Sequence, residues 1–230
     1  MRFNPYLFDL DNSLLYIPDP PQYFDNILVE TLKSFWIKQI PSREERNKFW
    51  NSGEHYIDLL DKWGIKLKDG ELFWRRFDAK DFEKRKILIA NNKITLFSDA
   101  LDVLKKLKAA GKKLALVTNT AKYIVDYVVE KFKLNDYFHD IFALGYGKEQ
   151  EIAKPSPEGI NLILKNLGFN QKKFSAIMIG DSKLDIIAAK RANIHACLLK
   201  RNLWKYSEAV DSWEYQPDFV IENLEEIFTL

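Results

Sequence analysis

The sequence has little of what disulfide-rich, zinc-binding and membrane-spanning proteins depend on. Its 230 residues include one cysteine, Cys197, which excludes an internal disulfide framework and a cysteine-based zinc site. The three histidines, at positions 55, 139 and 195, are far apart and lack the spacing of a histidine-rich metal site. No apolar run approaches the ~20 residues that a membrane span requires, and two aspartates by position 11 argue against a signal peptide. We therefore expect a cytoplasmic protein with no membrane as a partner.

The numbers of basic and acidic residues are also nearly equal. The chain has 35 lysines and arginines against 33 aspartates and glutamates, which gives a net charge of +2. A chain this close to balance has no overall field with which to grip nucleic acid, so we expect no nucleic-acid partner. The 47% of hydrophobic residues indicates a globular protein, and the length leaves room for one domain with a large insertion or for two small domains.

From residue 97 onward the chain has the alternation of short apolar runs and helical patterns that is typical of a parallel α/β sheet. We expect an edge strand at Phe219–Ile221, one strand at Tyr6–Phe8, and strands buried on both faces at residues 113–117, 141–144, 176–179 and 196–199. Ser98 is expected to cap a helix that ends at Gly111. Residues 156–158 are expected to open a helix that ends at Gly168.

Between residues 16 and 96 this alternation stops. The segment is rich in tryptophan, lysine and glutamate, and four of the six tryptophans (36, 50, 63 and 74) lie in it. Helical periodicity is present at residues 24–37, 43–51, 55–63 and 70–82. We therefore expect a small all-helical domain inserted after the first strand, with the tryptophans in its core.

Polar residues follow each of the predicted strands. Ligands of open parallel sheets bind outside the carboxyl ends of the strands, so these residues are expected to share one edge of the sheet. They are Asp9, Asp11 and Ser13 after the first strand, Thr118, Asn119 and Thr120 after the second, Lys154 after the third, and Gly180, Asp181, Ser182 and Asp185 after the fourth.

Taken singly, each of these residues is more simply explained as a turn, cap or solvated residue. Together they place four carboxylates where their charges would repel one another. A hard divalent cation makes such a cluster tolerable, and Mg²⁺ prefers carboxylate oxygens together with substrate phosphate. The hydroxyls, the lysine and a helix N-terminus near Ala121 suit a phosphate oxyanion. The cluster therefore predicts phosphoryl transfer.

Four segments in this order, FDLDNS, LVTNT, the Lys154-Pro155 pair and GDSKLD, resemble the four motifs of the haloacid dehalogenase-like superfamily. The position of the insert resembles its helical-cap branch, that of phosphoglycolate phosphatase and β-phosphoglucomutase-like proteins. The resemblance implies an α/β fold. A Rossmann-like parallel sheet with helices on both faces would form the catalytic core (residues 1–15 and 97–230), and residues 16–96 would form the helical cap domain.

The resemblance also implies roles for the residues at the sheet edge. Asp9 would be the nucleophile that forms an aspartyl-phosphate, and Asp11 would protonate the leaving oxygen and then deprotonate the hydrolytic water. Thr118 and Asn119 would hold the transferring phosphoryl group. Lys154 would bind the phosphate and offset the charge around Asp9.

A Mg²⁺ site is part of the same resemblance. Asp9 and Asp181 would bind the ion directly, Asp11 through its backbone carbonyl, and Asp185 either directly or through a water molecule. The family commonly has Gly-Thr or Gly-Val after the second aspartate, where this chain has Asn12 and Ser13. Asparagine tolerates left-handed backbone angles, so we expect Asn12 to keep the turn. By the same argument Asn193 is expected to end the last helix in place of glycine.

We therefore predict a Mg²⁺-dependent phosphatase that acts on a small phosphorylated metabolite, as a monomer or homodimer. True haloacid dehalogenases lack a carboxylate at the position of Asp11, which argues against that branch. A phosphomutase or phosphotransferase on the same core stays an alternative. A receiver-like signalling module is another, although such modules are about half as long and place an acidic pair after their first strand.

In the cap, Arg75, Arg76 and His55 are candidates for substrate contacts. The simpler interpretation of these residues is a solvated helix face.

Overall fold

The computed structural model describes every residue except 1, 53–54, 67, 69, 146 and 202–209. The chain divides into two compact units. The first comprises Met1–Tyr16, Leu96–Leu144 and Ile152–Leu230, and the second comprises Ile17–Thr95 and Gly145–Glu151. Two short strands, β2 (Leu15–Tyr16) and β3 (Thr95–Leu96), pair where the chain passes from one unit to the other. Among the described residues, no helix combines the length and the apolar character needed to cross a membrane.

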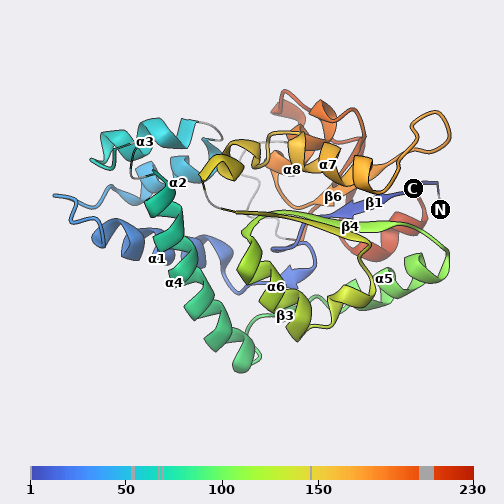
Figure 1. The fold of residues 1–230 in the computed structure, drawn as a ribbon, viewed down its shortest axis with the longest axis horizontal. Helices are drawn as coiled ribbons and strands as arrows, with labels where there is room; N and C mark the ends of the chain where they lie inside the picture. The colour runs from blue at the N-terminus through green and yellow to red at the C-terminus, as the bar shows by residue number, and fades with distance from the viewer. Residues whose placement is uncertain (1, 53–54, 67, 69, 146, 202–209) are drawn as a thin grey trace. The chain divides into compact units, whose positions relative to one another are not determined.

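The first unit is built on a six-stranded sheet in the order β5-β4-β1-β6-β7-β8, and every neighbouring pair is parallel (Figure 1). The strands are β1 (Tyr6–Phe8), β4 (Leu114–Ala121), β5 (Asp140–Leu144), β6 (Ile177–Gly180), β7 (His195–Leu199) and β8 (Phe219–Ile221). β1 is fully buried, as its central place requires, and β8 lies at an edge. The predicted parallel α/β sheet and its edge strand are confirmed.

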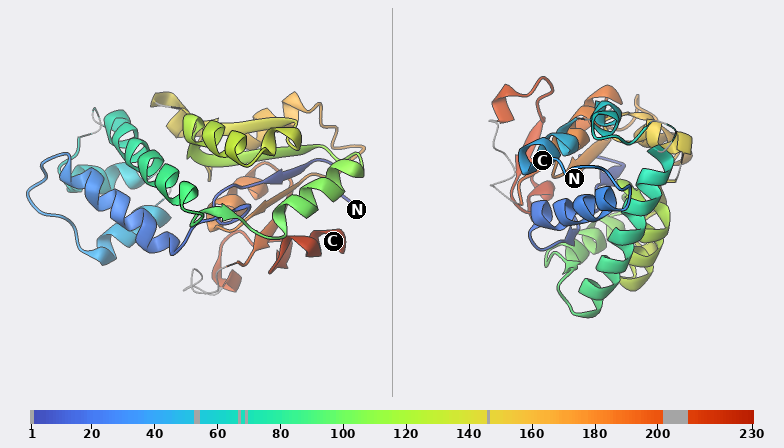
Figure 2. Two further views of the ribbon diagram at one scale, coloured as in Figure 1. Left: turned by 90° about the horizontal axis from the view of Figure 1, so that it is seen from below. Right: turned by 90° about the vertical axis from the view of Figure 1, so that its left-hand side faces the viewer.

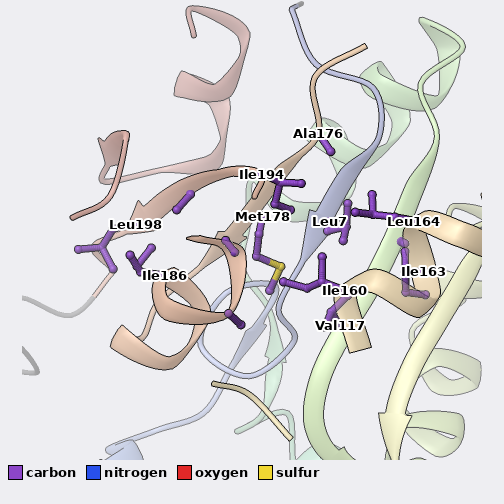
Figure 3. Close-up of a cluster of buried hydrophobic side chains, with 14 of the residues drawn as sticks. Leu7, Val117, Ile160, Ile163, Leu164, Ala176, Met178, Ile186, Ile194 and Leu198 are labelled. Atoms are coloured by element: carbon purple, nitrogen blue, oxygen red, sulfur yellow. The ribbon is translucent and has the colours of Figure 1, made fainter. Parts of the chain in front are cut away.

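Helices cover both faces of this sheet. α7 (Glu158–Asn166) and α8 (Lys183–Arg191) lie on one face, and α5 (Ala100–Ala109) and α6 (Lys122–Lys131) on the other (Figure 1). Figure 3 shows the core beneath α7 and α8, where one large side chain from each inner strand meets the apolar faces of the two helices. The strand side chains are Leu7, Val117, Met178 and Leu198, and the helix side chains are Ile160, Ile163, Leu164 and Ile186. Short 3-10 helices lie at Leu134–Asp136, Gly147–Ile152, Val210–Ser212 and Leu224–Phe228.

Several predicted helix ends are confirmed. Gly111 and Gly168 follow α5 and α7 with positive φ angles of 69° and 61°, and Asn193 follows α8 with a φ of 56°. Ser98, however, does not cap α5. The N-cap residue is Asp99, and no side chain caps this helix. The Asp99 carboxylate binds Arg201 instead, a partner 102 positions away that no local pattern indicates.

Two predictions about strands were wrong. β5 was expected to be buried on both faces, yet only Leu144 of its five residues is buried, because β5 lies at the edge of the described sheet, next to β4. The Thr118–Asn119–Thr120 segment was expected to follow its strand. It lies inside β4, whose register against β5 shifts between Val117 and Ala121.

The described residues of the second unit form the α-helices α1 (Pro20–Lys33), α2 (Arg43–Asn51), α3 (Tyr56–Lys62) and α4 (Gly70–Ala90), of which α1 and α4 lie side by side (Figure 2). α1 begins four residues before the predicted start, because Asp19 accepts a hydrogen bond from the Gln22 amide and two prolines follow it. α4 runs past the predicted end at residue 82. The buried side of its C-terminal half includes Arg85, whose Nε lies 2.8 Å from Oδ1 of Asp81. Because charged residues are buried here, the apolar pattern predicts a helix end that is too early.

The core of the second unit is aromatic. Trp50, Trp63 and Trp74 pack around Phe49 with ring centroids 5.1 to 5.9 Å from it, as expected of tryptophans in a small helical unit. Trp36 does not share this role, since it is 92% exposed.

Candidate active site

The sheet places three carboxylates together at the carboxyl ends of neighbouring strands. Asp9 directly follows β1, and its amide donates to the Ile179 carbonyl of β6 at 2.9 Å. Asp181 directly follows β6, and Asp185 lies in the first turn of α8. All three side chains are buried, and one oxygen from each lies within 4.8 Å of the others.

Lys154 is buried among these carboxylates. Its Nζ donates to Oδ1 of Asp9 at 2.7 Å, to Oδ1 of Asp185 at 2.5 Å and to the Val117 carbonyl at 2.9 Å. These three contacts use all three hydrogens of the ammonium group. Lys154 and Asp9 are therefore in contact at the edge of the sheet where the sequence analysis placed both residues.

The electrostatics of the group favour a cation. Burial raises the pKa of Asp9 to about 8, and the charges of Asp185 and Asp181 add to the rise while Lys154 opposes it. Burial would lower the pKa of Lys154, but Asp185 and Asp9 hold it above its ordinary value. When ionised, the three carboxylates and the ammonium carry a net charge of −2. Hard carboxylate oxygens with this excess of negative charge fit a divalent cation such as Mg²⁺.

Asp185 is fixed by the start of its own helix. Its Oδ2 accepts from the Ser182 hydroxyl at 2.6 Å and from the Ser182 amide at 3.0 Å, while the Asp185 amide donates back to the hydroxyl. A Cβ on Gly180 would lie 2.3 Å from the Asp185 carboxyl carbon, so the position needs glycine. The sequence interpretation gave Ser182 no role, although its S-x-x-D spacing is that of a capping box.

The end of β4 holds three other residues of the site. Both polar atoms of the Asn119 side chain bind the Lys154 backbone, Nδ2 to the carbonyl at 2.9 Å and Oδ1 to the amide at 2.8 Å. The Thr120 hydroxyl donates to Oδ2 of Asp11 at 2.9 Å. Thr118 is buried, and its hydroxyl oxygen accepts from the Thr120 amide. Phosphate binding by Thr118 and Asn119 stays a prediction. The contact of Thr120 with Asp11 was missed, because it joins residues 109 positions apart.

The turn after Asp9 has the predicted backbone. Asn12 has a φ of 60°, in the left-handed region that asparagine tolerates. The Leu10 carbonyl accepts from the amides of Ser13, Leu14 and Leu15 and closes the turn. The Ser13 hydroxyl donates to Oδ2 of Asp9 at 3.4 Å, so the retained hydroxyl points at the expected nucleophile.

The three cap candidates lie in the second unit, and each has a local partner there. Arg75 and His55 each contact an acidic side chain about one turn away, at 2.7 and 3.4 Å. The guanidinium carbon of Arg76 lies 4.3 Å from the centre of the Phe35 ring. Their contact with substrate stays a prediction.

Comparisons with known proteins show which family this chain is similar to. Residues 6–199 match the profile of a family described as haloacid dehalogenase-like hydrolase. A phosphoglycolate phosphatase from Psychrobacter arcticus is 29% identical over 191 residues, which cover 82% of this chain and 79% of that protein. A pyrophosphatase, PpaX, from Oceanobacillus iheyensis is 24% identical over 230 residues, which cover 100% of this chain and 97% of that protein. The crystal structure of CbbY from Rhodobacter sphaeroides, in complex with phosphate, shares the fold at a TM-score of 0.70 and 19% identity, covering 98% of this chain and 96% of that one.

Proposed function

This chain belongs to the haloacid dehalogenase-like hydrolases and is a phosphatase of that family, and from this premise we propose that it is a Mg²⁺-dependent enzyme that cleaves a small phosphorylated metabolite through a phosphorylated Asp9. The observation that carries the proposal is the buried contact of Lys154 with Asp9 and Asp185 inside a group of three carboxylates. Lysine at this point offsets the charge that an incoming phosphate adds.

In the proposed first step, a carboxylate oxygen of Asp9 attacks phosphorus and the bond from phosphorus to the leaving oxygen breaks. Oδ1 of Asp9 is held by Lys154, whereas the one hydrogen bond that the described residues give Oδ2 is the long contact with Ser13, so we assign the attack to Oδ2. Asp11 gives its proton to the leaving oxygen.

In the second step a water molecule attacks the phosphorus of the aspartyl-phosphate and loses its proton to Asp11. The bond from Asp9 to phosphorus breaks, inorganic phosphate leaves, and both aspartates return to their starting states. The hydrogen bond from Thr120 to Oδ2 of Asp11 holds this acid and base in one orientation.

Asp9, Asp181, Asp185 and the backbone carbonyl of Asp11 would hold Mg²⁺. The ion, when bound, supplies positive charge that offsets the phosphate and the surrounding carboxylates. Without such charge, burial and the neighbouring carboxylates raise the pKa of Asp9 to about 8, which disfavours its nucleophilic form.

We also propose that residues 16–96 act as a cap domain that selects the substrate, with Arg75, Arg76 and His55 as candidate contacts. The relatives named above are called a phosphoglycolate phosphatase and a pyrophosphatase. Phosphoglycolate and pyrophosphate are therefore the first substrates to test. A monomer or homodimer in the cytoplasm, with no nucleic-acid partner, completes the proposal.

The test is phosphate release from an aryl phosphate, phosphoglycolate and pyrophosphate, with and without Mg²⁺. It compares the wild type with Asp9→Asn and with Asp126→Asn, whose exposed side chain pairs with Lys122. We expect Mg²⁺-dependent release that Asp9→Asn abolishes and Asp126→Asn preserves. Rapid acid quenching should trap one phosphoryl group per wild-type chain and none on Asp9→Asn.

Residual turnover of Asp9→Asn near the wild-type rate would remove Asp9 as the nucleophile. A trapped phosphoryl group without release to water would favour the phosphomutase or phosphotransferase alternative, and added sugar phosphates would then serve as acceptors. Circular dichroism of each variant shows whether the fold is intact.

A further inference from the structure

Arg201 lies two residues beyond the end of β7, and only 8% of its side chain is exposed. Its Nε and Nη2 both donate to the Ser13 carbonyl at 3.2 Å. Its Nη1 and Nη2 donate to the two carboxylate oxygens of Asp99 at 2.9 and 2.6 Å. Every nitrogen of the guanidinium is therefore engaged, and its carbon lies 3.9 Å from the centre of the Phe97 ring.

The Ser13 carbonyl belongs to the turn that presents the nucleophile. The hydroxyl of the same residue donates to Oδ2 of Asp9, and its amide donates to the Leu10 carbonyl. A guanidinium fork on this carbonyl fixes the plane of the following peptide bond. Ser13 is thus held between Leu10 on one side and Arg201 on the other, with its hydroxyl on Asp9.

The anchor of Arg201 is itself fixed. Oδ2 of Asp99 also accepts from the Leu224 amide at 2.9 Å, so the carboxylate is tied to the start of the last 3-10 helix. Ser13, Asp99 and Leu224 come from three distant parts of the chain: Arg201 joins Ser13 to Asp99, and the Asp99 carboxylate joins Arg201 to the Leu224 amide. A planar fork with five donors suits this arrangement, and the single ammonium of lysine does not.

We propose that Arg201 is a positioning residue for the hydrolysis: through the Ser13 carbonyl it holds the turn that follows Asp9, and so keeps the nucleophile and Asp11 in their reactive orientations. This inference rests on the proposed function of Asp9. It assigns Arg201 no contact with substrate.

A purely structural Arg–Asp pair would affect stability and leave the chemistry alone. The second unit offers a matched control of that kind. Arg46 donates to Oδ1 and Oδ2 of Asp25 at 2.6 and 2.8 Å and to the Pro41 carbonyl at 2.5 Å. Its contacts are one carboxylate and one carbonyl, as for Arg201, but its carbonyl is not in the turn after Asp9.

The experiment compares the wild type with Arg201→Gln, Arg201→Lys and Arg46→Gln. For each protein, kcat and KM are measured well below the melting temperature, and amide hydrogen exchange is followed in residues 10–15. We expect Arg201→Gln to lower kcat ~10–100-fold, as for a misplaced reacting group, with KM within about 3-fold of wild type. Exchange in residues 10–15 should become faster. For Arg201→Lys, kcat and the exchange rate should lie between those of the wild type and Arg201→Gln. Arg46→Gln should match the wild type in kcat and in the exchange of residues 10–15.

Equal effects of Arg201→Gln and Arg46→Gln on kcat, or unchanged exchange in residues 10–15, would overturn the inference. If Arg201→Gln does not fold, Asp99→Asn takes its place, since it weakens the anchor and leaves the Ser13 contact. The same pattern at smaller size is then expected. The exchange experiment needs no turnover. Active wild type with inactive Asp9→Asn keeps the proposed function whatever Arg201→Gln does.

Discussion

The side chain of Asn119 is paired with the backbone of Lys154 at both of its polar atoms, through hydrogen bonds of 2.9 and 2.8 Å. The ammonium of the same lysine donates to the Val117 carbonyl. β4 therefore holds Lys154 at both ends, by its backbone and by the tip of its side chain. The precision with which Lys154 meets Asp9 depends on an amide 35 positions earlier in the chain.

Asn119→Ala should lower kcat by ~10–100-fold through displacement of Lys154, and should leave KM within a few-fold of wild type. Steady-state kinetics on the best substrate gives both constants. The control is Asn166→Ala, which removes an exposed amide that donates to Oδ2 of Asp140 at 2.8 Å. A large rise in KM with kcat unchanged would instead place Asn119 on the substrate.

Thr120→Val should weaken the general acid, because the hydroxyl that holds Oδ2 of Asp11 is lost. We expect a loss of up to ~10-fold in kcat for a poor leaving group and a smaller loss for an activated aryl phosphate, where protonation matters little. Asp11→Asn should show the same contrast at larger size. Thr120→Ser keeps the hydroxyl and should stay near wild type. Equal losses on both substrates would count against the role of Asp11.

Removal of Mg²⁺ with a chelator should abolish turnover and lower the stability of the wild type. At a Mg²⁺ concentration 100 times the dissociation constant, the ion should add about 2.7 kcal/mol to the free energy of unfolding. Asp181→Asn should lose most of this gain. Thermal unfolding with and without Mg²⁺ measures both effects, with Asp126→Asn as the control.

Asp78, buried in α4, should make the protein less stable as the pH rises. Burial raises its pKa to about 7, Asp81 adds to the rise, and Arg85 opposes it. The fold therefore favours the protonated form, and this stability is lost between the unfolded pKa of 3.8 and about 7. Asp78→Asn avoids the loss, so its advantage over wild type should be about 2.5 kcal/mol larger at pH 8 than at pH 5.

Chemical unfolding of the wild type and of Asp78→Asn at pH 5 and pH 8 measures this difference. The contributions of the other titrating groups to the free energy of unfolding are the same in both proteins and cancel. Asp126→Asn, at an exposed aspartate of α6 that pairs with Lys122, serves as the control and should show no such change. A pH-independent difference for Asp78→Asn would show that Asp78 is ionised in the fold.

The sequence predicted best where the signal is local. β1 and β8 lie where their apolar runs placed them, and glycine or asparagine ends α5, α7 and α8 at positive φ. The order of strands is a non-local property, which is why the exposure of β5 was missed. The positions of Asp9, Lys154, Asp181 and Asp185 at one edge followed from strand ends alone.

Hydrogen bonds between residues far apart in the chain cannot be predicted from local sequence patterns. Arg201 with Ser13, Asn119 with Lys154 and Thr120 with Asp11 are separated by 188, 35 and 109 positions. Each supports a residue that the sequence did identify. Sequence patterns thus found the groups expected to react with phosphate, and the structure was needed to find the groups that hold them.

The central place of β1 has a consequence for synthesis on the ribosome. Residues 6–8 emerge before their partners in the sheet, which are residues 114–116 and 177–179. At ~5–20 residues per second, the roughly 170 residues between β1 and β6 take on the order of 10–30 s to translate. The helices α1 to α4 emerge during this delay, and β1 has no neighbour in the sheet until β4 follows them. A nascent chain released before Asp185 would lack one of the three clustered carboxylates, so the candidate site is completed only after the helices of the second unit have emerged.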